Sequence, residues 1–190
     1  SINGMVFVRG QSQDYDHWAQ LGNRGWSYSD VLPVFKRMES FEGGESEFRG
    51  KDGPLKVTTN RESGPLVDAI FAASEQVGIP TNPDYNGANQ EGIAITQATI
   101  NGGRRMSTAR CYLDPARSRS NLVIETNALA TQLVLNGTRC VGVRYTANGQ
   151  PREASAAREV VVSTGSINSP QLLELSGIGN PEHLGEVGIS

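Results

Sequence analysis

Residues 159–179 read EVVVSTGSINSPQLLELSGIG, and this stretch decides the fold class. The run of valines predicts a buried strand at residues 160–163 that ends in a tight turn at Gly165. Ser169 and the proline after it predict the start of a helix, and Gly177 predicts its end in a left-handed conformation. This unit holds ligands beyond the carboxyl end of the strand in many α/β proteins. An ordinary strand-to-helix turn in a core would show the same pattern.

Composition excludes several classes of protein. The chain has 190 residues and a net charge of -3, from 17 basic and 20 acidic residues that are interspersed along it. This balance gives no electrostatic reason to expect nucleic acid or an anionic membrane as a partner. No stretch approaches the roughly 18 consecutive apolar residues of a membrane span. Cys111 and Cys140 lie far apart with no CxxC or His-rich neighbourhood, so we expect free thiols and no metal site.

Outward from this stretch, turn residues and hydrophobic spacing predict a mixed α/β fold with α+β character. Glycine-rich residues 43–53 are expected to form an exposed loop. Helices are expected in two short patterns around Gly22 and Gly25, the second capped by Ser27 or Ser29, and at 65–77, after Ser107 or Thr108, and at 181–187. Strands are expected at 54–58, 92–100, 122–125, 132–135 and 141–145, with hairpin turns at Asn136-Gly137 and Asn148-Gly149.

Several separated motifs occur in the order typical of one family. The stretch from Gly165 to Gly179 resembles the second signature of the glucose-methanol-choline (GMC) oxidoreductase family. Ile2 and Asn3, followed by Phe7, Gly10 and Asp16, resemble the latter part of its first signature. The segments GNRGWSYSDVLPVFKRME, GKDGPLKV, GGRRMSTARCYLDPA and NLVIETNALATQLVLNG lie between the two signatures in the family's usual order. The residues MVFVRG are similar to the choline dehydrogenase-like branch. Independent motifs in a fixed order are far more specific than one glycine pattern.

The resemblance implies an FAD-binding enzyme that oxidises a small-molecule alcohol by passing its hydride to flavin N5. Family members are several hundred residues long, and this sequence is similar to their middle part. It contains no GxGxxG nucleotide fingerprint and does not match the C-terminal portion that carries the catalytic histidine. We therefore expect no catalytic residue in this chain. His17 and His183 match no catalytic base of the family and are expected to be surface or packing residues.

The same resemblance assigns cofactor-binding residues at three places. Asn3, Gly4, Met5 and Val6 match the segment that runs along the isoalloxazine ring and the pyrophosphate of FAD. A flavin needs main-chain N–H donors near its ring, and Gly4 lets the chain approach closely. A buried strand edge is the alternative interpretation of these residues.

Two further positions match the nucleotide side of the site. The main chain of Ala130 matches the position that pairs with the adenine edge, and Gly165 matches a turn close to the nucleotide. The alternatives are a small residue in a β-turn for Ala130 and helix-strand packing for Gly165. Some members link the flavin covalently to a histidine just before the asparagine. Ile2 occupies that position here, so we expect non-covalent FAD.

The sequence thus predicts a fragment of an FAD-dependent alcohol oxidoreductase. Residues 1–60 and 121–190 would belong to the FAD-binding domain, and residues 61–120 to the substrate-binding domain. A non-catalytic remnant or binding module with no activity of its own is the competing hypothesis. The sequence leaves the oligomeric state and the alcohol open, does not separate an oxidase from a dehydrogenase, and slightly favours the cytoplasm without deciding the location.

Overall fold

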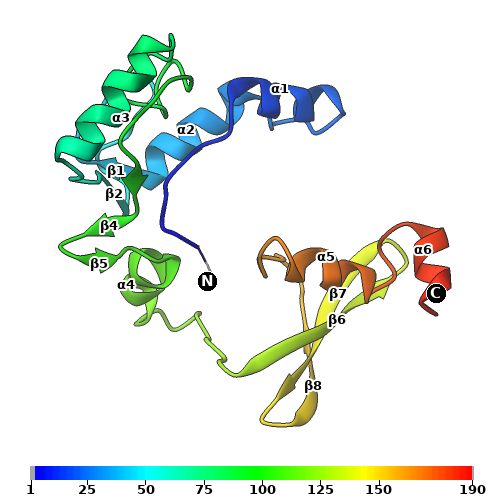
Figure 1. The fold of residues 1–190 in the computed structure, drawn as a ribbon. Coiled ribbons are helices and arrows are strands. Elements are labelled where there is room, and N and C mark those ends of the chain that lie inside the picture. The colour runs from blue at the N-terminus through cyan, green and yellow to red at the C-terminus, as the bar shows by residue number, and fades with distance from the viewer. Residues whose placement is uncertain (1–2, 190) are drawn as a thin grey trace. The chain divides into compact units, whose positions relative to one another are not determined.

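The computed structural model describes residues 3–189, which divide into two compact units. Residues up to Leu122 form the N-terminal unit, and residues from Val123 form the C-terminal unit. Helices and strands both contribute to each unit, as expected for a mixed α/β fold (Figure 1). The assignment of residues 1–60 and 121–190 to one domain and 61–120 to another stays a prediction.

The N-terminal unit begins with two helices whose ends are set locally. These are α1 (Ser12–Gln20) and α2 (Tyr28–Met38). Ser27 caps α2: its hydroxyl accepts the Asp30 N–H, and the Asp30 carboxylate accepts the Ser27 N–H, which satisfies two donors at the helix start. Of the two candidate caps, Ser27 is therefore the one used. The helices pack through aromatic rings, with Tyr15 edge-on to Trp18 and to Phe35.

A small three-stranded sheet forms the centre of this unit. Its strands are β1 (Glu39–Phe41), β2 (Leu55–Thr59) and β3 (Gln97–Ala98), in the order β1-β2-β3. β1 pairs parallel with β2, and β2 pairs antiparallel with β3. Leu55, Val57 and Cys111 are buried on it and form the core together with half-buried Phe7, Met38, Phe41 and Met106.

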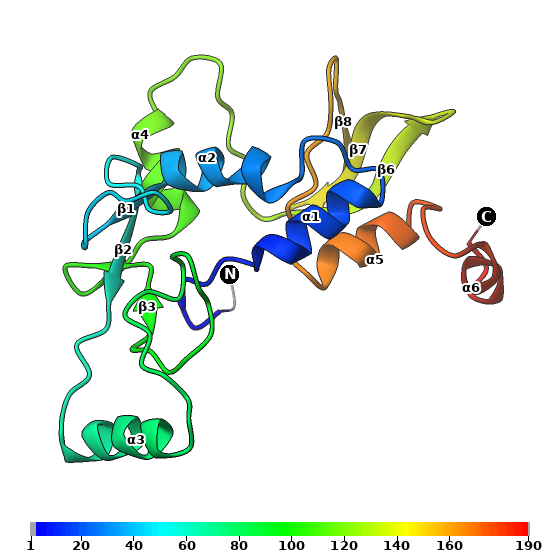
Figure 2. The ribbon, with the colours of Figure 1, turned by 90° about the horizontal axis from the view of Figure 1, so that it is seen from above.

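Three elements complete the N-terminal unit. Helix α3 (Pro65–Gln76) ends before Gly78, as predicted. Figure 2 shows α3 at the end of two extended segments, away from the sheet. The hairpin β4 (Ile100–Asn101) and β5 (Arg104–Arg105) follows β3. A π-helical turn (Ala109–Leu113) then continues into α4 (Asp114–Ala116), and the Ser107 hydroxyl accepts the Arg110 N–H at its start.

The C-terminal unit is an antiparallel meander covered by a helix. Its strands are β6 (Ala128–Asn136), β7 (Arg139–Ala147) and β8 (Gln150–Ser155), in the order β6-β7-β8. Both predicted Asn-Gly turns connect these strands. Helices α5 (Asn168–Glu174) and α6 (Pro181–Glu186) follow, and α5 packs on β6 (Figure 1). The Ser176 hydroxyl accepts the Leu133 N–H at 2.8 Å and donates to the Leu172 carbonyl at 2.6 Å, which covers the edge of β6.

The structure corrects the prediction made for the valine run. Residues 160–163 belong to none of the described strands, and Val161 is 77% exposed. An apolar run becomes a strand only where a neighbouring strand shares its hydrogen bonds, and the described strands of this unit pair with one another instead. The helix after it is confirmed, although Ser169 does not cap it: its hydroxyl instead accepts the Thr164 N–H at 3.1 Å. Gly177 is left-handed with φ 80° and ends the helical segment, as predicted.

Three other predictions also need correction. Residues 122–125 form no strand, and the Glu125 carboxylate instead accepts the Tyr145 hydroxyl and the Arg152 guanidinium. The strand expected over 92–100 shortens to β3 and the first residue of β4. Gly50 and Gly53 are buried, so the second half of the loop expected to be exposed is packed. A Cβ atom at Gly50 would lie 1.9 Å from the Lys36 carbonyl oxygen, which only glycine avoids.

Candidate functional site

The predicted flavin-contacting segment, Asn3 to Val6, lies at the edge of the sheet in the N-terminal unit. Val6 pairs antiparallel with Ala98 of β3 through an isolated bridge. The Phe7 N–H donates to the Gln97 carbonyl at 2.8 Å, and the Thr99 N–H donates to the Met5 carbonyl at 2.9 Å. The segment therefore lies along the sheet edge, but Asn3, Gly4 and Val6 are exposed, so it is not the buried strand edge given as the alternative.

Met5 has an unusual backbone conformation. Its φ is +64°, in the left-handed region that non-glycine residues rarely occupy. The Asn3 side-chain oxygen accepts the Met5 N–H at 2.9 Å, and the same oxygen accepts Nη1 of Arg105 at 2.7 Å. The bend at Met5 is thus held by the Asn3 side chain, and Asn3 is in turn bound by Arg105.

The segment leaves room and donors for a ligand. Apart from its two chain neighbours, no atom of residues 3–189 lies within 4 Å of the position that a Cβ would take at Gly4. Within residues 3–189, the N–H groups of Gly4 and Val6 donate no hydrogen bond. Gly4 is exposed, and Val6 is 53% exposed. A planar, electron-rich ring with acceptor atoms is the kind of group that open main-chain donors of this sort can bind.

A network of buried charges lies behind this segment. The Glu39 carboxylate accepts Arg9 Nη2 at 2.5 Å and Arg49 Nε at 3.1 Å. Arg49 Nη1 also donates to Asp84 at 2.5 Å. Two guanidinium groups and two carboxylates balance in charge, so the network is neutral as a whole. Burial lowers the pKa of Arg9 and the Glu39 carboxylate opposes this shift.

Asn86 and Gln97 join this network to the main chain that follows the segment Asn3 to Val6. Asn86 Oδ1 accepts the Arg9 N–H at 2.8 Å, and its Nδ2 donates to the Phe7 carbonyl at 3.0 Å and to Gln97 Oε1 at 2.9 Å. An amide side chain thereby pairs with the main chain of residues 7–9 as a neighbouring strand would. Nearly all of these donors and acceptors satisfy one another, and buried Arg9 Nε is the one side-chain atom that lacks a partner among the described residues. The network therefore forms a rigid support behind the segment.

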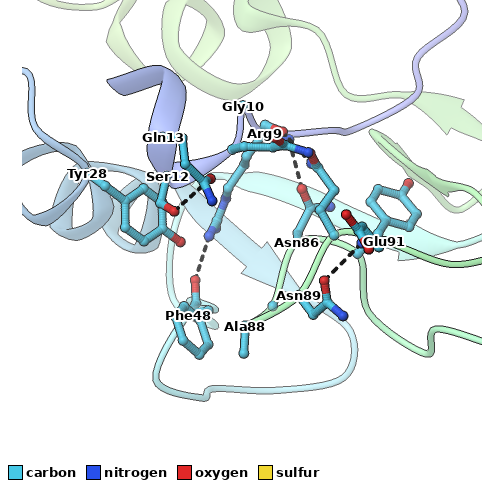
Figure 3. Close-up of a pocket in the computed structure, with 14 residues that line it drawn as sticks. Arg9, Gly10, Ser12, Gln13, Tyr28, Phe48, Asn86, Ala88, Asn89 and Glu91 are labelled. Carbon is cyan, nitrogen blue, oxygen red and sulfur yellow. Dashed lines mark hydrogen bonds between the residues drawn. The ribbon is translucent and has the colours of Figure 1, made fainter. Parts of the chain in front are cut away.

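A cavity of about 280 Å³ opens beside this network, between the residues after Val8 and the loop that follows Asn82. Figure 3 shows Arg9 crossing it, with its main-chain N–H bound to Asn86 and its guanidinium directed at Phe48. The Tyr28 phenol lies on another wall, and burial raises its pKa above the ordinary value. Most polar groups of the wall already bind other protein groups, so we assign this cavity no chemistry.

The two remaining predicted cofactor residues lie in the C-terminal unit. Ala130 is half-buried on β6 and pairs with Tyr145 of β7, next to an irregularity in the strand register. Gly165 lies in the turn before α5 with φ +97°, and no described atom beyond its chain neighbours lies within 4 Å of a Cβ added there. Its carbonyl accepts the Ser169 N–H at 2.9 Å. The four residues of the flavin-contacting segment thus lie together in one unit, and these two lie in the other.

Other candidate residues show no site. His17 and His183 are both exposed, as expected for surface residues. Cys111 is buried and Cys140 half-buried, both as free thiols. Among the residues that the structure describes, no three His, Cys, Asp or Glu side chains cluster in a way that could hold a metal ion. No described helix is both long and apolar enough to cross a bilayer.

Comparison with known proteins decides the family. Residues 1–188 match GMC oxidoreductase. The chain belongs to this family. It is 47% identical over 189 residues to human mitochondrial choline dehydrogenase, aligning 100% of this chain with 32% of that protein. It is 49% identical over 190 residues to the oxygen-dependent choline dehydrogenase of Rhizobium johnstonii, where it covers 34% of the relative.

Two solved structures resemble the fold closely. Pyridoxine 4-oxidase from Mesorbium loti superimposes with a TM-score of 0.87 at 30% identity, over 99% of this chain and 37% of that one. An FAD-dependent oxidoreductase from Chaetomium thermophilum also has a TM-score of 0.87, at 29% identity, over 100% of this chain and 35% of that one. The chain therefore spans about a third of the length of the relatives that it matches.

Sequence reasoning missed the residues that hold the flavin-contacting segment. Arg105 lies in a sequence with Arg104 and Arg110 nearby, and no local pattern distinguishes it from them. Thr99 lies 94 positions from Met5, whose carbonyl its side chain contacts at 3.3 Å. Pairs this far apart leave no trace in spacing or periodicity. Only the register of the hairpin after β3 reveals them.

Proposed function

We propose that the protein containing this chain binds FAD and oxidises a small alcohol. The observation that carries the proposal is the match of the chain to GMC oxidoreductase over residues 1–188, together with 47% and 49% identity to two choline dehydrogenases. This chain would supply part of the FAD site. The residues that exchange a proton with the alcohol would lie outside it.

The flavin-contacting segment fits the isoalloxazine side of FAD. Its Gly4 position is open, and the N–H groups of Gly4 and Val6 are free of partners within the described residues. Main-chain N–H groups can stabilise the negative charge of a reduced ring without reorganising. Bound FAD would supply the acceptor for the hydride that leaves the alcohol. Asn3 and Met5 would shape the segment, because the Asn3 side chain accepts the Met5 N–H at 2.9 Å.

For the nucleotide side, we propose Ala130 and Gly165. Ala130 offers the main chain of β6 beside a register irregularity, and such irregularities redirect main-chain groups near ligand sites. Gly165 combines an exposed position with space at its α-carbon, which permits close approach of a ligand to the main chain. Neither side chain would contribute a functional group, so both contacts would be made by the backbone.

We further propose non-covalent FAD. Ile2 occupies the position of the flavin-linked histidine of some family members, and an isoleucine side chain has no nucleophilic atom. Ile2 lies outside the residues that the structure describes, so this proposal rests on the sequence. Denaturing the holoprotein should release all of its flavin into solution. Flavin that stays with the precipitated protein would contradict a non-covalent link.

For the substrate, we propose a small alcohol, and choline is the first one to test because two relatives are named for it. The full-length protein should show flavin absorbance in the visible range. Choline added without oxygen should bleach this absorbance. Tetramethylammonium, which keeps the quaternary ammonium group but has no hydroxyl group, provides the matched control. A full-length protein that carries no flavin, or a flavin that a panel of small alcohols leaves oxidised, would refute the proposal.

An experiment with the isolated chain distinguishes this proposal from the hypothesis of a non-catalytic binding module. We expect the 190-residue chain alone to lose added FAD during gel filtration, since only part of the predicted site is present. FAD that co-elutes with it, without bleaching by any alcohol, would favour the binding module. Co-elution with alcohol-dependent bleaching would show that the chain alone is catalytic and would overturn our expectation.

A further inference from the structure

We propose that Arg105 is a positioning residue that holds the flavin-contacting segment in the bent form that FAD contacts. Arg105 lies on β5, and its guanidinium reaches Asn3 across 102 positions in the sequence. The link of this contact to FAD rests on the proposed function. The contact itself does not depend on it.

Arg105 binds Asn3 at two points. Nη1 donates to the Asn3 side-chain oxygen at 2.7 Å, and Nη2 donates to the Asn3 main-chain carbonyl at 3.4 Å. A planar guanidinium with two parallel donors fixes both the side chain and the peptide plane of its partner. The orientation of Asn3 is thereby set by a residue in another part of the fold.

The orientation of Asn3 in turn determines the bend at Met5. The Asn3 oxygen that binds Arg105 also accepts the Met5 N–H at 2.9 Å. A methionine at φ +64° is in a strained backbone conformation, so it stays bent only where neighbours hold it. The Arg105 guanidinium and the Met5 N–H thus meet on one acceptor atom.

The hairpin that carries Arg105 also holds the other side of the bend. Thr99 donates twice to the Met5 carbonyl, from its N–H at 2.9 Å and from its hydroxyl at 3.3 Å. Ile100, the next residue, pairs with Arg105 across the hairpin, and the Met106 N–H donates to the Thr99 carbonyl at 2.9 Å. Thr99 and Arg105 therefore belong to one hydrogen-bonded unit that contacts Asn3 and Met5 together.

Arg104 provides a matched control on the same strand. It is exposed, as Arg105 is, and its side chain makes no hydrogen bond or ion pair with the described residues. R104M and R105M therefore remove the same charge and the same side-chain type from neighbouring positions. R105K keeps the charge of Arg105 but removes the planar fork, so it separates positioning from electrostatic attraction.

The first measurement is hydrogen exchange in the full-length protein freed of flavin. We expect the peptide that contains residues 3–9 to exchange faster in R105M and R105K than in wild type, and at the wild-type rate in R104M. This readout needs no bound cofactor. Exchange in R105M that equals exchange in R104M would overturn the proposed positioning role.

The second measurement is the Kd of the same variants for added FAD. We expect R105M and R105K to bind about tenfold more weakly than wild type, since a tenfold change corresponds to about 1.4 kcal/mol and one charge-assisted contact is lost. R104M should stay within about twofold of wild type by the same scale. Wild-type affinity in R105K would refute the role of the fork. A wild-type protein that binds no FAD would refute the proposed function, while the exchange result would still decide the role of Arg105.

Discussion

Arg49 and Glu39 form an ion pair that solvent does not reach, with side chains 1% and 0% exposed. The Arg49 Nε atom lies 3.1 Å from each Glu39 carboxylate oxygen. Arg9 binds the same carboxylate from another side, and the Gly50 N–H also donates to it at 3.1 Å. A charge buried in this way is tolerated only because its partners are present, so it is the most sensitive point of the N-terminal unit.

Substitution E39Q should strongly destabilise the protein. It leaves two buried guanidinium groups without their shared counterion, and breaking a buried pair on one side costs about 3 to 5 kcal/mol. Urea unfolding of the full-length protein measures this free energy. E45Q is the control, because Glu45 and Lys51 form a pair whose side chains are both 53% exposed, and such pairs contribute at most about 1 kcal/mol. Equal losses in the two variants would contradict the buried network as described.

Substitution Y85F should lower the free energy of unfolding by about 1 to 3 kcal/mol at pH 8, because it leaves the buried Gln97 N–H without an acceptor. The Tyr85 hydroxyl accepts the Gln97 N–H at 2.6 Å, and Gln97 is 1% exposed. The measurement is urea unfolding of both proteins in the same buffer. A loss below about 0.5 kcal/mol, the range of ordinary surface substitutions, would show that water replaces the phenol.

The same phenol makes stability depend on pH. Burial raises the pKa of Tyr85 in the folded protein above its ordinary value of about 10. Below pH 10 both states keep the proton, so its contribution is fully present. As the pH rises above 10 the unfolded state ionises first, and stability falls until the folded-state pKa is passed. Y85F should therefore lose stability less steeply than wild type above pH 10, and identical slopes would argue against the raised pKa.

Substitution S176A tests a residue of the second signature for a structural role. Its hydroxyl is the acceptor for the Leu133 N–H at the edge of β6, and Ser176 is 9% exposed. Leaving that amide unpaired should cost about 1 to 3 kcal/mol in urea unfolding. S163A serves as the control, since Ser163 is exposed and makes no side-chain hydrogen bond among the residues described. If S176A is as stable as S163A, the Ser176 hydroxyl does not stabilise the edge of β6.

Substitution G50A should destabilise by several kcal/mol, because the new methyl group would meet the Lys36 carbonyl oxygen at 1.9 Å and backbone would have to move. G185A has open space around its Cβ position and lies within α6, so it should be neutral or stabilise by about 0.4 to 1 kcal/mol. Thermal unfolding of the two variants compares them directly. A G50A protein that melts with wild type would show that the loop around Gly50 is loosely packed.

Local signals predicted the elements whose stability is local. The capping box at Ser27, the stop at Gly78 and the Asn-Gly turns lie within a few residues of the groups that they bind, so the sequence contains all of the information needed. β8 was missed because all six of its residues are exposed, which leaves no alternation of apolar side chains to read. The strand predicted at residues 160–163 was wrong because apolar character alone does not supply a pairing partner.

In the candidate site, too, some features could be predicted from the sequence and others could not. Asn3 to Val6, Ala130 and Gly165 were assigned from a resemblance, and their role as cofactor contacts stays a prediction. The conformation of that segment depends on Arg105 and Thr99, which spacing did not reveal. The glycine-rich loop was predicted to be exposed because of its composition, yet Arg49 within it is one of the most buried side chains described. Composition does not show which charge meets a counterion.

The sequence by itself determined the family, the helix and hairpin ends, and the expected place of the FAD contacts. These features depend on ordered motifs or on hydrogen bonds between near neighbours. Only the tertiary structure decided which residues hold the segment Asn3 to Val6 and the chain after it, with Arg105 bound to Asn3 across 102 positions and Asn86 bound to Arg9 across 77. Such contacts exist because a common core brings distant segments together, and the free energy that orders them belongs to the fold as a whole.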